Sequence, residues 1–263
     1  MKILKIASLI GCAGALCGWP GFSQVPASSG SGAEPVGARV RSLIGFAVEN
    51  HDGARLGVIK DFVVDFHTGR INYAIISAAG ILGLRPQLTA VPPQALSPAT
   101  VKQRTLALDI GKARWKDAPR FHKKDLQLLS ERTWEVQIYQ FYHLPVPGSK
   151  PPRGGPALPK GGLELASATI GWTVLNQQGE VLGRLSEWLL DLSDQRPAMA
   201  IVGLTGRPPG KATYAIPLRG LKLAGSGQLV VNATRGMFEQ ARMFTPKSWP
   251  PMAGSTVTVL RFE

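Results

Sequence analysis

The chain has 263 residues, of which 44% are hydrophobic and 18% are charged, an ordinary balance for a globular protein that can bury a core. Its 30 glycines and 21 prolines favour turn-rich β structure and linkers over long helices. The net charge of +13 is consistent with a solvated surface rich in lysine and arginine, and the alternative is an acidic partner such as nucleic acid, anionic lipid or another acidic polymer. The two cysteines, Cys12 and Cys17, both lie near the N-terminus. The rest of the chain has no cysteine, which excludes disulfides, thiolate metal sites and a cysteine nucleophile there.

The first residues have the pattern of a secretory signal peptide. A basic start, residues 1–5, precedes an apolar run over residues 6–19, which Pro20 and Gly21 interrupt. Cleavage after Ser23 makes residues 1–23 the signal peptide and residues 24–37 a disordered lead-in, although Ala27 is a second candidate site. We therefore expect a periplasmic or secreted protein, with a lipoprotein anchored at Cys12 as the alternative.

A long internal repeat organises the remainder of the chain. Residues 43–65 recur as residues 169–191, a shift of 126 positions. The repeat predicts two copies of one domain, at residues 38–143 and 164–263, joined by a Pro/Gly-rich linker at 144–163. The coinciding polar and glycine positions are Gly45 and Gly171, Asn50 and Asn176, Gly53 and Gly179, Gly57 and Gly183, and Asp65 and Asp191.

The first copy predicts a meander of short strands at residues 43–48, 56–66, 71–77, 88–91 and 105–110, with a glycine-rich loop over 78–85. Gly53 suits a tight turn, and Gly57 suits a bulge or the close approach of a neighbouring strand. Residues 112–121 predict a helical turn in which Trp115 and Phe121 cover one end of a barrel, and residues 134–142 predict a last strand.

The second copy repeats this order. It predicts strands at residues 198–204, 214–217 and 256–261, a glycine-rich loop at 206–210, and Phe238 at the position of Trp115. The linker stretch 144–162 contains six prolines and five glycines, so we expect it to hold the two copies apart. The predicted fold class is all-β, with two small β-barrels in tandem, each followed by a short helical turn.

The first copy resembles the PRC-barrel domain, a small β-barrel found in the photosynthetic reaction centre H subunit, in the ribosome maturation factor RimM and in many stand-alone bacterial proteins. The second copy departs from the pattern at Gln178, at residues 194–197 and at Met199. The residues that carry the resemblance are Ile44, Gly45, Val48, Asn50, Asp52, Gly53, Leu56, Gly57, Ile59, Asp61, Asp65, Gly69, Ile71, Tyr73, Ala74, Ile76 and Ser77.

The resemblance implies a docking or assembly module without a catalytic motif. A ribosomal role fits poorly with an exported chain that lacks the accompanying RimM domain, so no nucleic acid is expected. A reaction-centre role normally goes with a transmembrane helix, which the mature chain lacks. Fold alone does not give function, so the partner stays open.

The residues themselves offer little catalytic chemistry. The histidines share no metal-like spacing, and no nucleophile, phosphate-loop or dinucleotide motif is present, so neither a metal nor another cofactor is expected. Asp61 and Asp65 lie four residues apart, on one face of a strand, and Glu187 and Asp191 repeat them. Acid–base catalysis is one interpretation, but repetition in both copies favours a structural role in accepting turn amides or pairing with arginine.

Two features are candidates for an interaction surface, although the favoured interpretation is a solvated face for the basic run and core or barrel-capping positions for the aromatic group. A basic run is the densest positive stretch, and an aromatic group lies next to the linker. We expect a non-enzymatic protein-interaction module of the bacterial envelope, with an unidentified protein partner; the alternative is binding of anionic lipid or acidic polymer through the basic surface. The candidate surface residues are Lys112, Arg114, Lys116, Arg120, Lys123, Lys124, Trp134, Tyr139 and Tyr142, and the structural motif residues are Gly45, Asp52, Gly53, Gly57, Asp65, Gly171, Gly179, Gly183 and Asp191.

Overall fold

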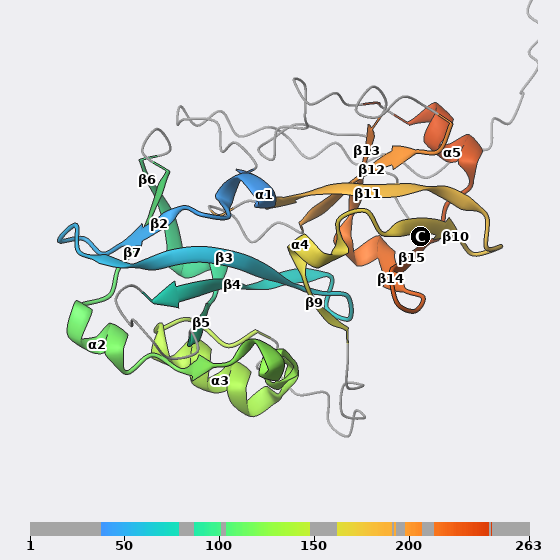
Figure 1. Ribbon diagram of the computed structural model, residues 1–263. Helices are drawn as coiled ribbons and strands as arrows, with labels where there is room; N and C mark the ends of the chain where they lie inside the picture. Colours follow the sequence, from blue (N-terminus) through green and yellow to red (C-terminus); the bar gives the residue numbers. More distant parts are fainter. Residues whose placement is uncertain are drawn as a thin grey trace, which may run out of the picture. The chain divides into compact units, whose positions relative to one another are not determined.

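A computed structural model describes residues 38–78, 87–100, 104–147, 162–190, 192, 198–206, 213–241 and 243 (Figure 1). The predicted signal peptide, lead-in, glycine-rich loops, most of the linker and the last predicted strand lie outside the described residues, as does Asp191. Strands dominate the described part, and they form two sheets, one in each copy. The all-β fold class and the tandem arrangement are therefore confirmed.

The first sheet has the strand order β6-β7-β2-β3-β4-β5-β8. Neighbours are antiparallel except for β2 and β7, which are parallel. The long hairpin of β3 and β4 supplies most of its surface (Figure 1). The strands are β2 (Ala47–Glu49), β3 (Arg55–Asp65), β4 (Arg70–Ala78), β5 (Leu88–Val91), β6 (Leu96–Thr100), β7 (Thr105–Leu108) and β8 (Arg120–Phe121).

The second sheet repeats that topology. Its order β13-β12-β11-β10-β15-β14 matches β5-β4-β3-β2-β7-β6 strand for strand, including the parallel pair in the middle. The strands are β10 (Thr173–Asn176), β11 (Val181–Leu190), β12 (Met199–Leu204), β13 (Thr213–Pro217), β14 (Leu221–Leu223) and β15 (Gln228–Val231).

Both copies contain short helices between their strands. Each copy begins with a two- or three-residue strand and one helical turn, β1 (Ala38–Arg39) with α1 (Val40–Leu43) and β9 (Leu163–Leu165) with α4 (Ala166–Thr169). The other pairs are η1 (Pro93–Ala95) with η4 (Leu218–Gly220), and α2 (Lys112–Lys116) with α5 (Arg235–Gln240). Only the first copy shows η3 (Lys123–Ser130) and α3 (Arg132–Phe141) among the described residues.

Two strand predictions were wrong. Residues 43–48 contain the end of α1 and the start of β2 rather than one strand. Residues 134–142 fall in helix α3, because Trp134, Ile138 and Tyr142 recur every four residues and face the apolar side of the first sheet. Their aromatic and β-branched content imitates a strand, but the helical period decides.

The N-terminal strand of each copy pairs with the sheet of the other copy. β1 lies antiparallel to β11, with Ala38 opposite Leu190, and β9 lies antiparallel to β3, with Glu164 opposite Val64. The two pairings occupy equivalent repeat positions, so the exchange is reciprocal. The linker therefore ends at β9, where Leu163 already belongs to the sheet.

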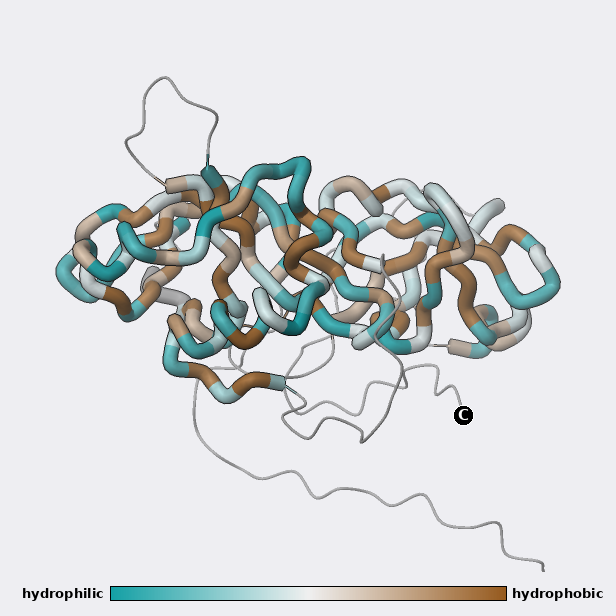
Figure 2. The backbone as a smooth tube through the Cα atoms, turned by 90° about the horizontal axis from the view of Figure 1, so that it is seen from below, coloured by the Kyte–Doolittle hydropathy of each residue, from teal (hydrophilic) through white to brown (hydrophobic). Residues whose placement is uncertain are grey.

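The exchange gives the two copies one shared core. Its buried side chains come from both sheets, and Phe66 of the first copy stacks on Trp172 at 6.5 Å and meets Trp188 edge-on at 6.1 Å between ring centroids. Figure 2 shows hydrophobic stretches along the strands and hydrophilic ones at many of the turns. The expectation that the linker holds the copies apart was wrong, because proline stiffens a connection without opposing the burial of apolar surface.

Gly57 and Gly183 mark the tightest strand approaches, as predicted for Gly57. A Cβ atom on Gly57 would lie 2.4 Å from the Ser77 carbonyl oxygen, and one on Gly183 would lie 2.1 Å from that of Gly203. We expect Gly183→Ala to destabilise the protein by about 1–3 kcal/mol, since the backbone must shift to admit the methyl group. Urea unfolding measures this, with Gly203→Ala as the control because open space surrounds its Cβ. Equal stabilities of the two variants would contradict the steric explanation.

Candidate interaction surface

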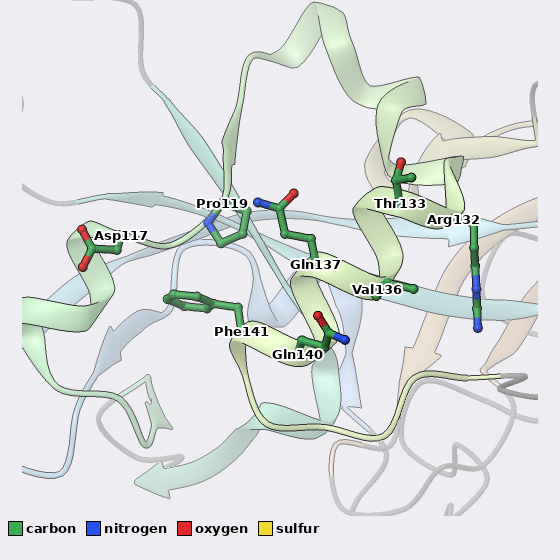
Figure 3. A pocket seen from close by; sticks show the side chains of 8 residues that line it. All are labelled: Asp117, Pro119, Arg132, Thr133, Val136, Gln137, Gln140 and Phe141. Atoms are coloured by element: carbon green, nitrogen blue, oxygen red, sulfur yellow. The ribbon is translucent and has the colours of Figure 1, made fainter.

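A surface groove lies between the end of α2 and helix α3 (Figure 3). Its volume is about 660 Å³, and it opens widely to solvent. Thr133, Gln137 and Gln140 point their polar side chains from the exposed face of α3, while Asp117 and Pro119 form the opposite side. The lining therefore combines amide and hydroxyl groups with the apolar surface of Val136, Phe141 and Pro119, which is suited to mixed polar and apolar contact with a partner.

Arg114 holds the two sides of this groove together. Its guanidinium lies 2.6 Å from the Nε2 atom of His143, donates a 2.6 Å hydrogen bond to the carbonyl oxygen of Phe141, and lies over the Phe141 ring at 5.1 Å from the centroid. These contacts join α2 to the C-terminal end of α3. Arg114 was predicted as a contact residue, but the structure gives its guanidinium a bracing role.

The predicted basic run contains exposed lysines and two arginines that donate hydrogen bonds to backbone carbonyl oxygens. Lys112, Lys116, Lys123 and Lys124 are exposed, and none of them forms an ion pair with a carboxylate of the described residues. Arg120 is half-buried and donates to the carbonyl oxygen of Lys116 at 3.5 Å. Lys116 directly precedes Asp117 of the groove, so positive charge borders one side of it.

The aromatic group next to the linker is mostly core, as the favoured interpretation expected. Tyr139 is 5% exposed and packs edge-on against Tyr73 at 6.4 Å, beneath α3. Trp134 and Tyr142 are half-buried against the same cluster. The favoured interpretation of Tyr139 as a core residue is therefore confirmed, and its side chain lies on the side of α3 that faces the sheet. Gln137 and Gln140 were missed because this segment was predicted as a strand, and the four-residue recurrence of Trp134, Ile138 and Tyr142 was the signal that could have found them.

The buried tyrosines predict alkaline instability. Burial raises the pKa of Tyr139 to about 12, helped by the nearby Glu135 carboxylate, and burial also raises the pKa values of Tyr73 and Tyr142. Unfolded tyrosine ionises near pH 10, so the unfolded state holds fewer protons above that pH; stability is complete below about pH 10 and is lost as pH rises toward about 12. Tyrosinate absorbance should appear together with the loss of circular dichroism. Ionisation near pH 10 in the intact fold would contradict this.

Asn50 and Asn176 organise equivalent turns. The side-chain oxygen of Asn50 accepts hydrogen bonds from the amides of Asp52 and Ala54, and its amide group donates to the Asp52 carboxylate. Asn176 does the same with the amides of Gln178 and Glu180, and donates to the Glu180 carboxylate. Glu180 thus supplies the carboxylate that Gln178 lacks, and the motif residue Asp52 is structural.

Asp61 and Glu187 join the copies. Oδ1 of Asp61 accepts the amide of Phe62 at 2.8 Å and that of Ser167 at 3.1 Å, while Oδ2 accepts the Ser167 hydroxyl. In the second copy, Glu187 accepts hydrogen bonds from the backbone amides of Trp188 and Arg41. Each carboxylate thus binds the first helical turn of the other copy, where backbone amides lack helical partners.

Asp65 has a separate structural role. Its Oδ1 atom accepts the amides of His67 and Thr68, and its Oδ2 atom accepts the side chain of Asn72. It therefore caps the β3–β4 turn. Asp61 and Asp65 share one strand face, as expected: Val63 between them packs in the cluster beneath α3, whereas Phe62 and Val64 belong to the shared core. The register shift between Val63 and Val64 comes from the extra residue Asn72 in β4 and leaves the alternation of β3 intact.

Trp115 covers its end of the sheet and donates its indole N–H to the Leu56 carbonyl oxygen. Phe121 was wrongly predicted to lie beside it and instead packs beneath α3.

The described residues contain no group of three or more histidine, cysteine or acidic side chains that could hold a metal ion. Within the same residues, no helix is long and apolar enough to cross a membrane.

Two copies of one small β-rich module, linked by reciprocal strand exchange, define the class of this protein. The PRC-barrel domain matches residues 35–114 and 162–238, one segment in each copy. The chain belongs to the PRC-barrel domain family. No curated protein matches it.

Proposed function

We propose that this protein is a non-catalytic docking module of the bacterial envelope and that it binds its protein partner in the α2–α3 groove. The groove itself carries the proposal: helix α3 presents Gln137 and Gln140 to a widely open hollow that Val136 and Phe141 also line. Such a surface recognises a partner by hydrogen bonds and shape.

Charge supports an acidic segment as the partner's contact. Lys112 and Lys116 project from α2, which ends at the groove, and Lys123 and Lys124 extend the positive charge into η3. Exposed lysines steer an acidic partner toward the surface and contribute little binding energy in salt, whereas the contacts within the groove persist.

The absence of a catalytic role rests on how the two candidate carboxylates are used. The carboxylate oxygens of Asp61 and Asp65 accept hydrogen bonds from backbone amides and from neighbouring side chains of the fold. A general acid or base needs a free oxygen facing a substrate. We therefore propose a binding role alone.

The envelope location rests on the leader pattern of residues 1–23. N-terminal sequencing of the protein purified from its own cells tests it. A chain that starts at Gln24 or Ser28 is expected, and one that starts at a lipid-modified Cys12 identifies the anchored form. An intact Met1 would contradict export.

Matched variants test the docking surface. In Gln137→Trp a neutral bulky side chain fills the groove, Lys116→Glu reverses charge beside it, and Lys222→Glu makes the same reversal on β14 of the second copy. Cross-linking pull-downs from the envelope fraction, washed at low and high salt, should recover a discrete protein with the unmodified chain. Gln137→Trp should lose at least tenfold of it at either salt, and Lys222→Glu should lose none.

The alternative is binding of anionic lipid or acidic polymer through the basic surface, which the net charge of +13 favours. It predicts that Lys116→Glu reduces recovery, that Gln137→Trp has no effect, and that high salt removes the bound material. That pattern would overturn docking in the groove.

A further inference from the structure

The large apolar side chains that this protein exposes to solvent lie in the second copy. Among the described residues they are Val181, Met237 and Met243, which are 45%, 37% and 56% exposed. Val181 begins β11, Met237 lies on α5, and Met243 follows that helix. The described part of the first copy exposes no large apolar side chain to this extent, so the two copies present different surfaces to solvent.

Helix α5 holds Met237 in a fixed position. The Arg235 side chain donates to the Glu180 carboxylate at 3.2 Å and to the carbonyl oxygen of Val181 at 3.4 Å, which ties the start of α5 to the start of β11. Phe238, the next residue after Met237, is buried in the shared core. Met237 therefore projects from an anchored helix.

The repeat gives the equivalent surface of the first copy a different character. Trp115 of α2 and Phe238 of α5 are both buried, so each helix keeps its aromatic anchor. Three exposed positions around them change from basic in the first copy to apolar or acidic in the second. With α2 matched to α5 and β3 to β11, the pairs are Arg55 and Val181, Arg114 and Met237, and Lys116 and Glu239.

We use "α5 surface" for Val181, Met237 and Glu239. Glu239 is exposed and forms no ion pair with another described residue. The same holds for Lys112 and Lys116 of α2, so each surface keeps its charge available to a partner. Opposite charges on two different surfaces of one chain favour contact between copies of that chain.

The α2–α3 groove can receive the apolar part of the α5 surface. Pro119, Val136 and Phe141 supply the apolar lining of the groove, and Lys116 borders it. A methionine side chain is unbranched and polarisable, so Met237 can fill an irregular hollow and contact an aromatic ring. The groove and the α5 surface therefore match in apolar character and in charge.

We propose that the α5 surface of one chain docks in the α2–α3 groove of a second copy of the same chain. This inference rests on the proposed docking function and names its partner. Because the two contacting surfaces differ, the contact is heterologous. Each chain that has used one of its surfaces still offers the other, so copies add head to tail, in a closed ring or an open row.

Sedimentation velocity of the purified protein at increasing concentrations tests self-association. The unmodified chain should form species larger than a monomer as the concentration rises. Met237→Asp places a charge on the α5 surface, and Gln137→Trp fills the groove. Each should raise the concentration needed for association at least about tenfold, with unchanged circular dichroism. Lys222→Glu on β14 is the control and should leave association unchanged.

A mixture of the two blocked variants tests the head-to-tail geometry. Met237→Asp keeps its groove and Gln137→Trp keeps its α5 surface, so together they should form a dimer that grows no further. Mixing would not restore a contact between two like surfaces, and that result would overturn the proposal. In one chain, Lys116→Glu combined with Glu239→Lys should restore at low salt the association that each change weakens alone.

This inference and the proposed function can fail separately. A chain that stays monomeric at every concentration overturns self-docking, as does self-association that neither Met237→Asp nor Gln137→Trp weakens. Self-docking also predicts that the pull-down from the envelope fraction recovers untagged copies of this chain. Recovery of a different protein instead, lost with Gln137→Trp, would overturn self-docking and leave the groove as a docking site for that protein.

Discussion

Trp188→Ala is expected to cost about 3–5 kcal/mol of unfolding free energy, the range for truncating a large aromatic side chain in a packed core. Trp188 is 0% exposed, its indole N–H donates to the Thr169 hydroxyl at 2.8 Å, and its ring meets Phe66 of the first copy. The cavity would therefore open where the two sheets share their core. Urea unfolding followed by circular dichroism measures the loss.

The chain itself offers the control for this variant. The equivalent position in the first copy holds Phe62, which is also 0% exposed. Trp188→Phe keeps an aromatic ring and should cost less than half as much, because the Thr169 hydroxyl retains its hydrogen bond to the Ala166 carbonyl oxygen. Two separate transitions, with only one of them shifted by Trp188→Ala, would show that the copies do not share one core.

Asp61→Ala should destabilise the protein by about 2–3 kcal/mol, because hydrogen bonds to charged groups contribute more than neutral ones and three donors would lose their acceptor. The amides of Phe62 and Ser167 and the Ser167 hydroxyl all depend on this carboxylate. Two of these donors belong to α4 of the second copy, so the loss falls on the contact between copies.

Asp61→Asn is the matched control, since its side-chain oxygen still accepts the two amides, while the negative charge and the acceptor of the Ser167 hydroxyl are lost. It should cost less than Asp61→Ala in the same denaturant experiment. A change of under about 0.5 kcal/mol for Asp61→Ala, the size of a neutral surface substitution, would show that the carboxylate does not join the copies.

The sequence predicted the strand meander well where the signals were local. The hairpin of β3 and β4 and strand β5 follow from alternating apolar residues and the turn glycines Gly53 and Gly69. The repeat also indicated correctly that Asp61 and Glu187 are structural, because a catalytic pair gains nothing from duplication. Their partners could not be predicted, since Ser167 and Arg41 lie in the other copy and only the fold brings them together.

Helix α3 could not be predicted well from the sequence. Its aromatic residues favour a strand by composition, and its helical period is visible over only ten residues. That error gave no role to Gln137 and Gln140, which are among the residues that line the groove. The exchange of β1 and β9 had no sequence signal at all, because strands this short gain their stability from the sheets that receive them.

Cutting the linker tests most directly whether the two copies form one unit. A protease site inserted within residues 148–161 leaves β1 with the first copy and β9 with the second, so each half still supplies a strand to the other. After complete cleavage, the two halves should elute together in size-exclusion chromatography and separate only when denaturant unfolds both in one transition. Two folded halves that elute apart in buffer would contradict the shared core.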